Sequence, residues 1–136
     1  MRPEEVLLVV YRPGPEFLVL LRSPERHGYW GLVAGGVEEG ELPERAALRE
    51  LTEETGLEQP AAFEPLPLDL GYRRPEGMWV ALHPFSVEAA LRWEPVLNEE
   101  HVEHRWCSEA EALGLLAYPE PREALREVAR RLEVRA

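Results

Sequence analysis

The sequence lacks lysine and isoleucine altogether, and its 136 residues include one cysteine, Cys107. A single cysteine excludes an internal disulfide and suits a reducing compartment, so we expect a cytoplasmic protein in which Cys107 is a bystander. No apolar run approaches the length needed to cross a membrane, and no signal peptide precedes the first expected strand. We therefore expect neither a disulfide-stabilised secreted domain nor a membrane protein.

Positive charge is also scarce, because 15 basic residues stand against 26 acidic ones and give a formal net charge of −11. Such a surface disfavours binding to nucleic acid polymers and to anionic membranes. A small anionic substrate remains compatible, since a bound metal ion can reverse the local potential. The length predicts a single domain over residues 1–136, which we expect to be a monomer or a homodimer.

The most informative stretch is the signature segment, residues 35–57, which reads GGVEEGELPERAALRELTEETGL. Its pattern is G-x5-E-x7-R-E-(aliphatic)-x-E-E-x-G-(aliphatic), which fixes nine positions. Average residue frequencies give a chance match on the order of one in a billion, and the abundance of glutamate raises this by about one or two orders of magnitude. A solvated acidic helix therefore does not account for the whole set.

The signature segment predicts a helix over residues 45–55, with Pro43 in its first turn and Gly56 just past its end. On that helix Glu50, Glu53 and Glu54 stand at i, i+3 and i+4 and share one face. Three carboxylates gathered on one turn repel one another unless a cation neutralises them. The spacing therefore predicts a site for a hard divalent cation such as Mg²⁺.

The signature segment resembles that of the Nudix hydrolases at every defined position. The resemblance implies an α/β/α sandwich of the α+β class, with a mixed, curved sheet between helices. It also implies hydrolysis of a nucleoside diphosphate linked to another group, with Mg²⁺ or Mn²⁺ as cofactor. By the same resemblance Glu53 and Glu54 bind metal, Glu50 binds metal or acts as a base, Glu41 assists at the metal cluster, and Arg49 orients Glu50.

The resemblance implies two further metal contacts outside the helix. The carbonyl oxygen of Ala34, just before the paired glycines, is often a ligand in the family. Many members also place one more glutamate near the helix metals, and Glu100 matches that place best, with Glu103 and Glu99 as alternatives. Leu42 departs from the family, which often has a serine or threonine there to cap the helix.

Five residues are candidates for contact with substrate, and each has an ordinary structural interpretation that stays open. Arg22 ends an expected strand where the family often carries a basic residue facing phosphates. His27 and Tyr29 lie in the following loop, where either ring can stack on a base. Tyr72 and Arg74 belong to an arginine-containing loop that can meet phosphate.

The rest of the chain predicts strands and helices that frame the signature segment. Expected strands cover residues 5–11, 16–21 and 78–87, an interrupted β region covers 61–70, a loop covers 71–77, a short strand covers 104–107, and helices cover 109–116 and 122–132. We expect the first two strands to be buried on both faces, because neither alternates between apolar and polar residues. The signature helix and the C-terminal helix should pack on opposite sides of the sheet.

The substrate is less defined than the reaction. Residues 100–125 resemble the dihydroneopterin-triphosphate and dATP pyrophosphohydrolase subgroup, which favours a nucleoside triphosphate cleaved to monophosphate and pyrophosphate. Tyr72 resembles a marker of diadenosine-polyphosphate hydrolases, and Pro75 one of ADP-ribose pyrophosphatases, so both substrates stay as alternatives. A non-catalytic nucleotide sensor is the alternative of another class, although sensors often lose a signature glutamate and this chain retains them all.

Overall fold

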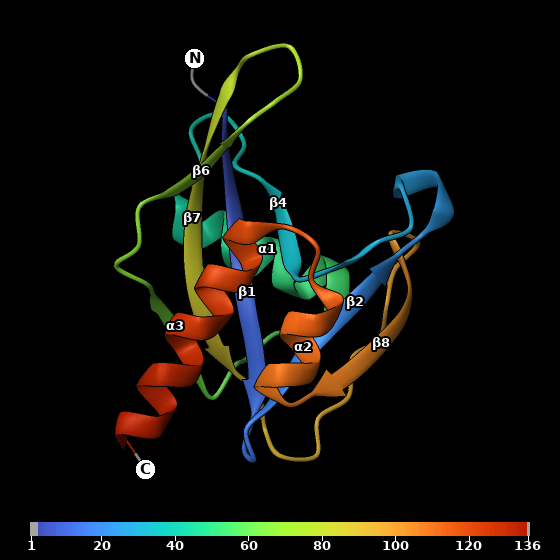
Figure 1. Cartoon of the computed structure of the whole chain (residues 1–136), viewed down its shortest axis with the longest axis vertical. Helices are drawn as coiled ribbons and strands as arrows, with labels where there is room; N and C mark the ends of the chain where they lie inside the picture. Colours follow the sequence, from blue (N-terminus) through green and yellow to red (C-terminus); the bar gives the residue numbers. More distant parts are fainter. Residues whose placement is uncertain (1–2, 136) are drawn as a thin grey trace.

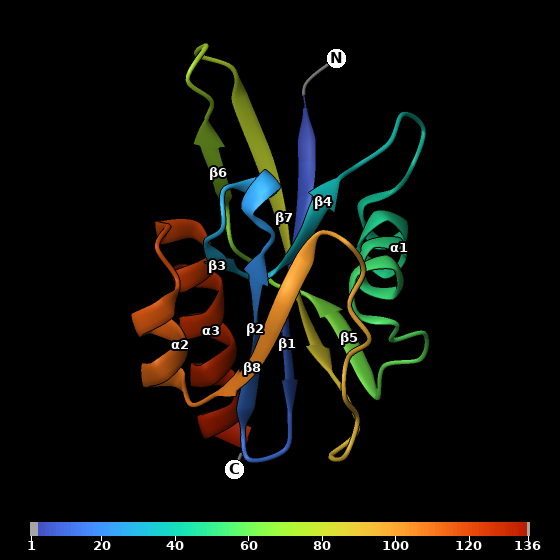
Figure 2. The ribbon, with the colours of Figure 1, turned by 90° about the vertical axis from the view of Figure 1, so that its right-hand side faces the viewer.

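The computed structural model describes residues 3–135 as a mixed sheet between helices (Figure 1). Its elements are β1 (Glu4–Arg12), β2 (Glu16–Arg22), the 3₁₀ helix η1 (Pro24–Arg26), β3 (Trp30–Gly31), β4 (Val33–Gly36), α1 (Pro43–Thr55), β5 (Ala62–Pro65), β6 (Leu70–Arg73), β7 (Trp79–Glu88), β8 (His101–Cys107), α2 (Glu109–Leu115) and α3 (Pro119–Arg135). Helix α1 covers one face of the sheet, and α2 and α3 cover the other (Figure 2). The predicted fold class and sandwich are confirmed.

Strand β1 is the centre of the sheet, where it runs parallel to β7 and antiparallel to β2 and β4. The order β3-β2-β1-β7-β5 forms the main path, and β4, β6 and β8 pair with β1, β7 and β2. Alternate residues of β1 enter two separate cores. Val6, Leu8 and Val10 face α1, whereas Leu7 and Val9 face α2 and α3, so the predicted burial on both faces is confirmed.

Local signals fix the ends of the helices. Helix α1 begins at Pro43 and ends at Gly56, whose φ of 79° is the left-handed conformation expected there. Ser108 and Glu111 form the predicted capping box at the start of α2. None of the helices in residues 3–135 is long and apolar enough to cross a membrane.

Several predicted boundaries are wrong, among them the start of the strand expected at residue 104, since β8 begins at His101. Residues 71–77 were expected to form a loop, but residues 71–73 belong to β6, which pairs antiparallel with β7. The loop composition is overridden there because Leu70 packs in the core and the segment forms an antiparallel hairpin with β7, in which Arg73 pairs with Trp79. Helix α3 begins at Pro119 instead of residue 122, since a proline in a first helical turn removes no needed hydrogen bond.

Candidate functional site

The site lies beside β1, at the point along this strand where its antiparallel partner changes from β2 to β4. Strand β1 pairs with β2 at Tyr11 and Arg12, and with β4 over residues 5–8. Helix α1 packs against β4, and β8 begins beside both of them (Figure 2). The sheet therefore brings the signature helix and the start of β8 to the same place.

Gly35 on β4 makes room for the carboxylate of Glu50. A Cβ atom at Gly35 would lie 2.1 Å from the carboxyl carbon of Glu50 and 2.2 Å from its Oε2 atom. No real side chain tolerates such a contact, so Glu50 would have to move. A Cβ atom at Gly36 would meet nothing within 4 Å among the described residues. Of the paired glycines, Gly35 is therefore the one that shapes the site.

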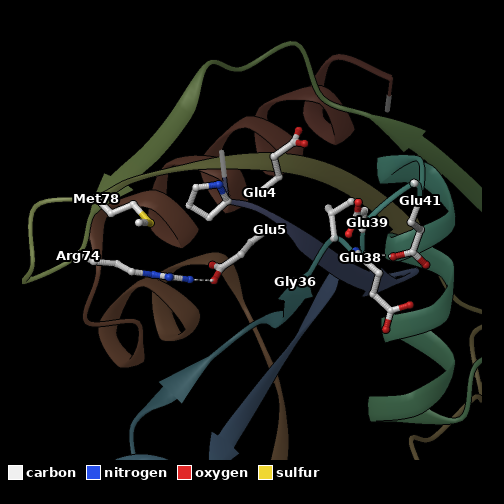
Figure 3. Close-up of a pocket in the computed structure, with 11 residues that line it drawn as sticks. Glu4, Glu5, Gly36, Glu38, Glu39, Glu41, Arg74 and Met78 are labelled. Carbon is white, nitrogen blue, oxygen red and sulfur yellow. Dashed lines mark hydrogen bonds and ion pairs between the residues drawn. The ribbon is translucent and has the colours of Figure 1, made fainter. Parts of the chain in front are cut away.

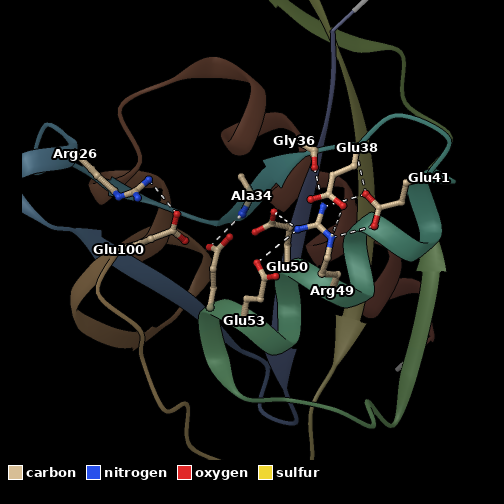
Figure 4. Close-up of polar contacts among 10 residues, drawn as sticks. Arg26, Ala34, Gly36, Glu38, Glu41, Arg49, Glu50, Glu53 and Glu100 are labelled. Atoms are coloured by element: carbon tan, nitrogen blue, oxygen red, sulfur yellow. Dashed lines mark hydrogen bonds and ion pairs between the residues drawn. The ribbon is translucent and has the colours of Figure 1, made fainter.

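Arg49 holds together the outer part of the site (Figure 4). Its Nε and Nη2 atoms donate to the two oxygens of Glu41 at 2.9 and 3.0 Å, and its Nη1 atom donates to Oε2 of Glu50 at 2.8 Å. Nη2 also donates to the carbonyl oxygen of Gly36 at 2.9 Å. These charge-assisted bonds hold the pKa of Glu41 down at about 2, so Glu41 stays ionised and fixed.

Glu53 and Glu54 are neighbours in sequence but lie in opposite environments. The Glu53 side chain is 53% exposed and receives one long contact, 3.5 Å from Nη1 of Arg49. Glu54 is 1% exposed, and its Oε1 accepts a weak bond from the N–H of Ala34 at 3.5 Å. Burial, together with the nearby carboxylates of Glu50 and Glu100, raises the pKa of Glu54 far above its ordinary 4.5.

The start of β8 supplies the other half of the site. One ligand atom from each of Glu54, Glu100 and His101 lies within 4.8 Å of the others. Within the described residues, both ring nitrogens of His101 and Oε2 of Glu54 lack a hydrogen-bond partner although they are buried. Burial lowers the pKa of His101 to about 4, so the ring is neutral at pH 7 and can act as a ligand. Unsatisfied buried acceptors around a gap of this size fit a divalent cation.

His101 is a residue that sequence reasoning missed. Its position directly after Glu100 was the available signal, but the strand was expected to begin at residue 104, whereas β8 begins at His101. Glu100 lies in the cluster as the sequence favoured, whereas the alternative Glu103 contacts Arg105 at 3.3 Å on the exposed part of β8.

Three of the substrate candidates, Arg22, His27 and Tyr29, belong to the end of β2 and the loop that follows it. Nε of Arg22 donates to the carbonyl oxygen of Arg26 at 3.0 Å, and its guanidinium lies 5.2 Å from the ring centre of Tyr29. That ring packs edge-on against Tyr118, with ring centres 5.1 Å apart. His27 closes η1 with a φ of 76°. Arg26, which the sequence did not single out, lies 3.0 Å from Glu100.

The other two candidates lie together on the far side of β4 and share one partner, Glu5. The hydroxyl of Tyr72 donates to Glu5 at 3.0 Å, and Arg74 lies 3.5 Å from the same carboxylate. Arg74 and Glu5 line a pocket of about 380 Å³ that also borders Gly36 and Glu41 (Figure 3). Carboxylates outnumber the single guanidinium in this pocket, so its charge disfavours phosphate unless Arg74 leaves Glu5.

Comparison with known proteins settles the family. A family model described as the NUDIX domain matches residues 1–131. The chain belongs to the Nudix hydrolase family. That assignment confirms the resemblance read from the signature segment.

Several curated relatives carry different names. Over 129 residues the chain is 38% identical to a Myxococcus xanthus protein named octanoyltransferase, which covers 88% of this chain. It is 33% identical over 120 residues to mouse bis(5'-nucleosyl)-tetraphosphatase (asymmetrical), covering 82% of this chain and 77% of that one. It is 26% identical over 135 residues to a dihydroneopterin triphosphate diphosphatase of Haemophilus influenzae, covering 90% and 85%.

The chain spans only part of some relatives. It covers 34% of the Myxococcus protein and 59% of an RNA pyrophosphohydrolase of Roseobacter denitrificans, with which it shares 37% identity over 94 residues. Among solved structures, a complex of a Caenorhabditis elegans Ap4A hydrolase superimposes with a TM-score of 0.81 at 26% identity, covering 96% of this chain and 97% of that one.

Proposed function

We propose that the chain hydrolyses a phosphoanhydride bond of a small nucleotide with the help of a divalent cation. The observation that carries this proposal is the buried Glu54 carboxyl, which faces Glu100 and His101 with one oxygen unpartnered. Burying an isolated carboxylate is unfavourable in free energy, so we infer that a nearby positive charge offsets it. A divalent cation on α1 and β8 provides that charge.

Glu54, Glu100 and His101 would hold the cation, with Glu50 and Glu53 of α1 beside them. A bound Mg²⁺ or Mn²⁺ lowers the pKa of a water molecule and neutralises charge on the phosphoryl oxygens. The nitrogen of His101 suits Mn²⁺ better than Mg²⁺, while the carboxylates suit both. The carbonyl oxygen of Ala34 is a further ligand that we carry over from the family.

The residues around the cation would then position the reacting groups. Arg49 holds Oε2 of Glu50 through Nη1 at 2.8 Å, which orients that carboxylate across Gly35. A carboxylate of α1 takes the proton of the attacking water, and we assign this base role to Glu50 or Glu53. Glu41 fixes the far side of the Arg49 guanidinium and so keeps Glu50 in place.

The substrate that we favour is a nucleoside triphosphate of the dATP or dihydroneopterin triphosphate type, cleaved to monophosphate and pyrophosphate. Support comes from the relative named dihydroneopterin triphosphate diphosphatase, 85% of whose length the chain covers. The mouse relative, at higher identity, supports a diadenosine polyphosphate as the second candidate. ADP-ribose is a third candidate. In any of these cases, Arg22, His27, Tyr29, Tyr72 and Arg74 are the proposed substrate contacts.

A panel of nucleotides with Mg²⁺ or Mn²⁺, resolved by product chromatography, tests the proposal. We expect one class to be cleaved at a phosphoanhydride bond, with activity lost in EDTA and restored by the metal. Undiminished hydrolysis in excess EDTA would contradict the metal mechanism. Tight nucleotide binding with no cleavage of any panel member would instead favour a sensor.

A further inference from the structure

Arg26 reaches the metal cluster from outside the signature segment. It is the last residue of η1, and its Nη1 atom lies 3.0 Å from Oε1 of Glu100 (Figure 4). The side chains are 45% and 25% exposed, so the ion pair is partly solvated. Such a pair contributes little to stability, so the guanidinium can be exchanged to another partner at small cost.

The backbone around Arg26 is anchored without that ion pair. The N–H of Ser23 donates to the carbonyl oxygen of Glu100 at 2.9 Å, and Nε of Arg22 donates to the carbonyl oxygen of Arg26 at 3.0 Å. The guanidinium can therefore change partner while η1 stays attached to the start of β8.

Glu100 consequently lies between a cation and a candidate cation site. A carboxylate oxygen of Glu100 belongs to the cluster with Glu54 and His101, and its Oε1 atom pairs with Arg26. A divalent ion in the cluster competes with the guanidinium for this carboxylate and also repels it. A freed guanidinium beside a metal-bound phosphate chain has a stronger partner in a phosphoryl oxygen, which it can bind in a bidentate manner.

We propose that Arg26 is a latch that pairs with Glu100 in the free protein and passes to a substrate phosphate when Glu100 turns to the divalent ion. The proposal rests on the proposed function, because it requires a metal and a phosphate at this site. It makes Arg26 a substrate-binding residue whose release is coupled to metal binding. Removing the Arg26 guanidinium should therefore raise the affinity for the divalent ion and lower the affinity for the phosphate ligand.

Glutamine variants test the latch by calorimetric titration. We expect Arg26→Gln to bind Mn²⁺ roughly two- to fivefold more tightly, since a competing pair of modest strength is lost. At saturating Mn²⁺ the same variant should bind imidodiphosphate, a pyrophosphate analogue that resists hydrolysis, about tenfold or more weakly, because a charged hydrogen bond is lost.

Two controls separate the latch from a general charge effect. Arg105→Gln removes an arginine that pairs with Glu103, also at the surface of β8, and should change neither affinity. In a Glu100→Gln background, Arg26→Gln should gain less Mn²⁺ affinity, because the carboxylate it competed for is gone, but should still lose imidodiphosphate affinity.

Unchanged or weaker Mn²⁺ binding by Arg26→Gln would overturn the latch, as would unchanged imidodiphosphate binding. Both readouts are binding constants, whereas the proposed function is tested by nucleotide cleavage and by its dependence on metal. If metal-dependent hydrolysis is observed but Arg26→Gln does not change the Mn²⁺ and imidodiphosphate affinities in opposite directions, the latch is wrong and the proposed function stands.

Discussion

At the residue scale, the site depends on the space and charge around each carboxylate. Glu53 and Glu54 follow one another on α1, yet one is half exposed and the other is buried beside His101. Glu50 occupies volume that Gly35 leaves open. Identical side chains on one helix therefore lie in different environments.

The paired glycines offer a test of this spacing. Gly35→Ala places a methyl group where the Glu50 carboxylate lies, so turnover should fall by roughly a hundredfold or more and stability by about 1–3 kcal/mol. Gly36→Ala is the matched control, because a Cβ atom there meets nothing within 4 Å in residues 3–135. Steady-state rates and denaturant unfolding would measure both. Equal losses in the two variants would contradict the account.

The pH dependence of stability tests the buried carboxyl. Without metal the folded-state pKa of Glu54 is raised, so above pH 4.5 the unfolded chain loses a proton that the folded chain keeps. The free energy of unfolding should therefore fall as pH rises, by up to about 1.4 kcal/mol per pH unit. His101, whose folded pKa is lowered to about 4, opposes this trend between pH 4 and its ordinary 6.5.

The contribution of Glu54 is thus isolated above pH 6.5. Metal-free wild type should lose stability between pH 6.5 and 8.5 in denaturant titrations, while Glu54→Gln, which has no proton to lose, should show a flatter profile. A flat wild-type profile would mean that Glu54 is ionised in the metal-free protein.

At the element scale, the sequence predicts features encoded within one segment and misses those that depend on pairing between strands. Helix α1 follows from Pro43, Gly56 and the spacing of its glutamates, all within one segment. The cluster partners Arg26 and His101 come from η1 and β8, which only the pairing of β2 with β8 brings together. Strand β6 was missed for the same reason, because its partner β7 determines it.

The two helix starts give a prediction about capping. Leu42 precedes α1 in an extended conformation without a side-chain cap, whereas Ser108 caps α2. Leu42→Ser should stabilise the protein by about 0.5–1 kcal/mol, and Ser108→Ala should destabilise it by about 1 kcal/mol. Thermal melts without metal would measure both. A Leu42→Ser variant no more stable than wild type would show that the start of α1 is already satisfied.

At the scale of the whole molecule, the proposed function requires an acidic protein to bind an anionic substrate. The net charge of −11 opposes the approach of a polyphosphate, and the cluster on α1 and β8 adds further negative charge. A divalent cation resolves this conflict, because it offsets the buried carboxylates and attracts phosphate at one point. The proposed function therefore makes metal binding the step on which activity depends.

The most direct test of that claim compares three glutamates of α1 by steady-state rate with Mg²⁺ on the nucleotide that the panel identifies. Glu53→Gln and Glu54→Gln keep size and helix propensity, but each removes a carboxylate that the proposed function places at the cation or beside it, so each should lower turnover by roughly a hundredfold or more. Glu44→Gln, on the exposed first turn of the same helix, is the control and should change it little. If all three variants retain wild-type rates, the carboxylates of α1 do not hold a catalytic metal and the account is wrong.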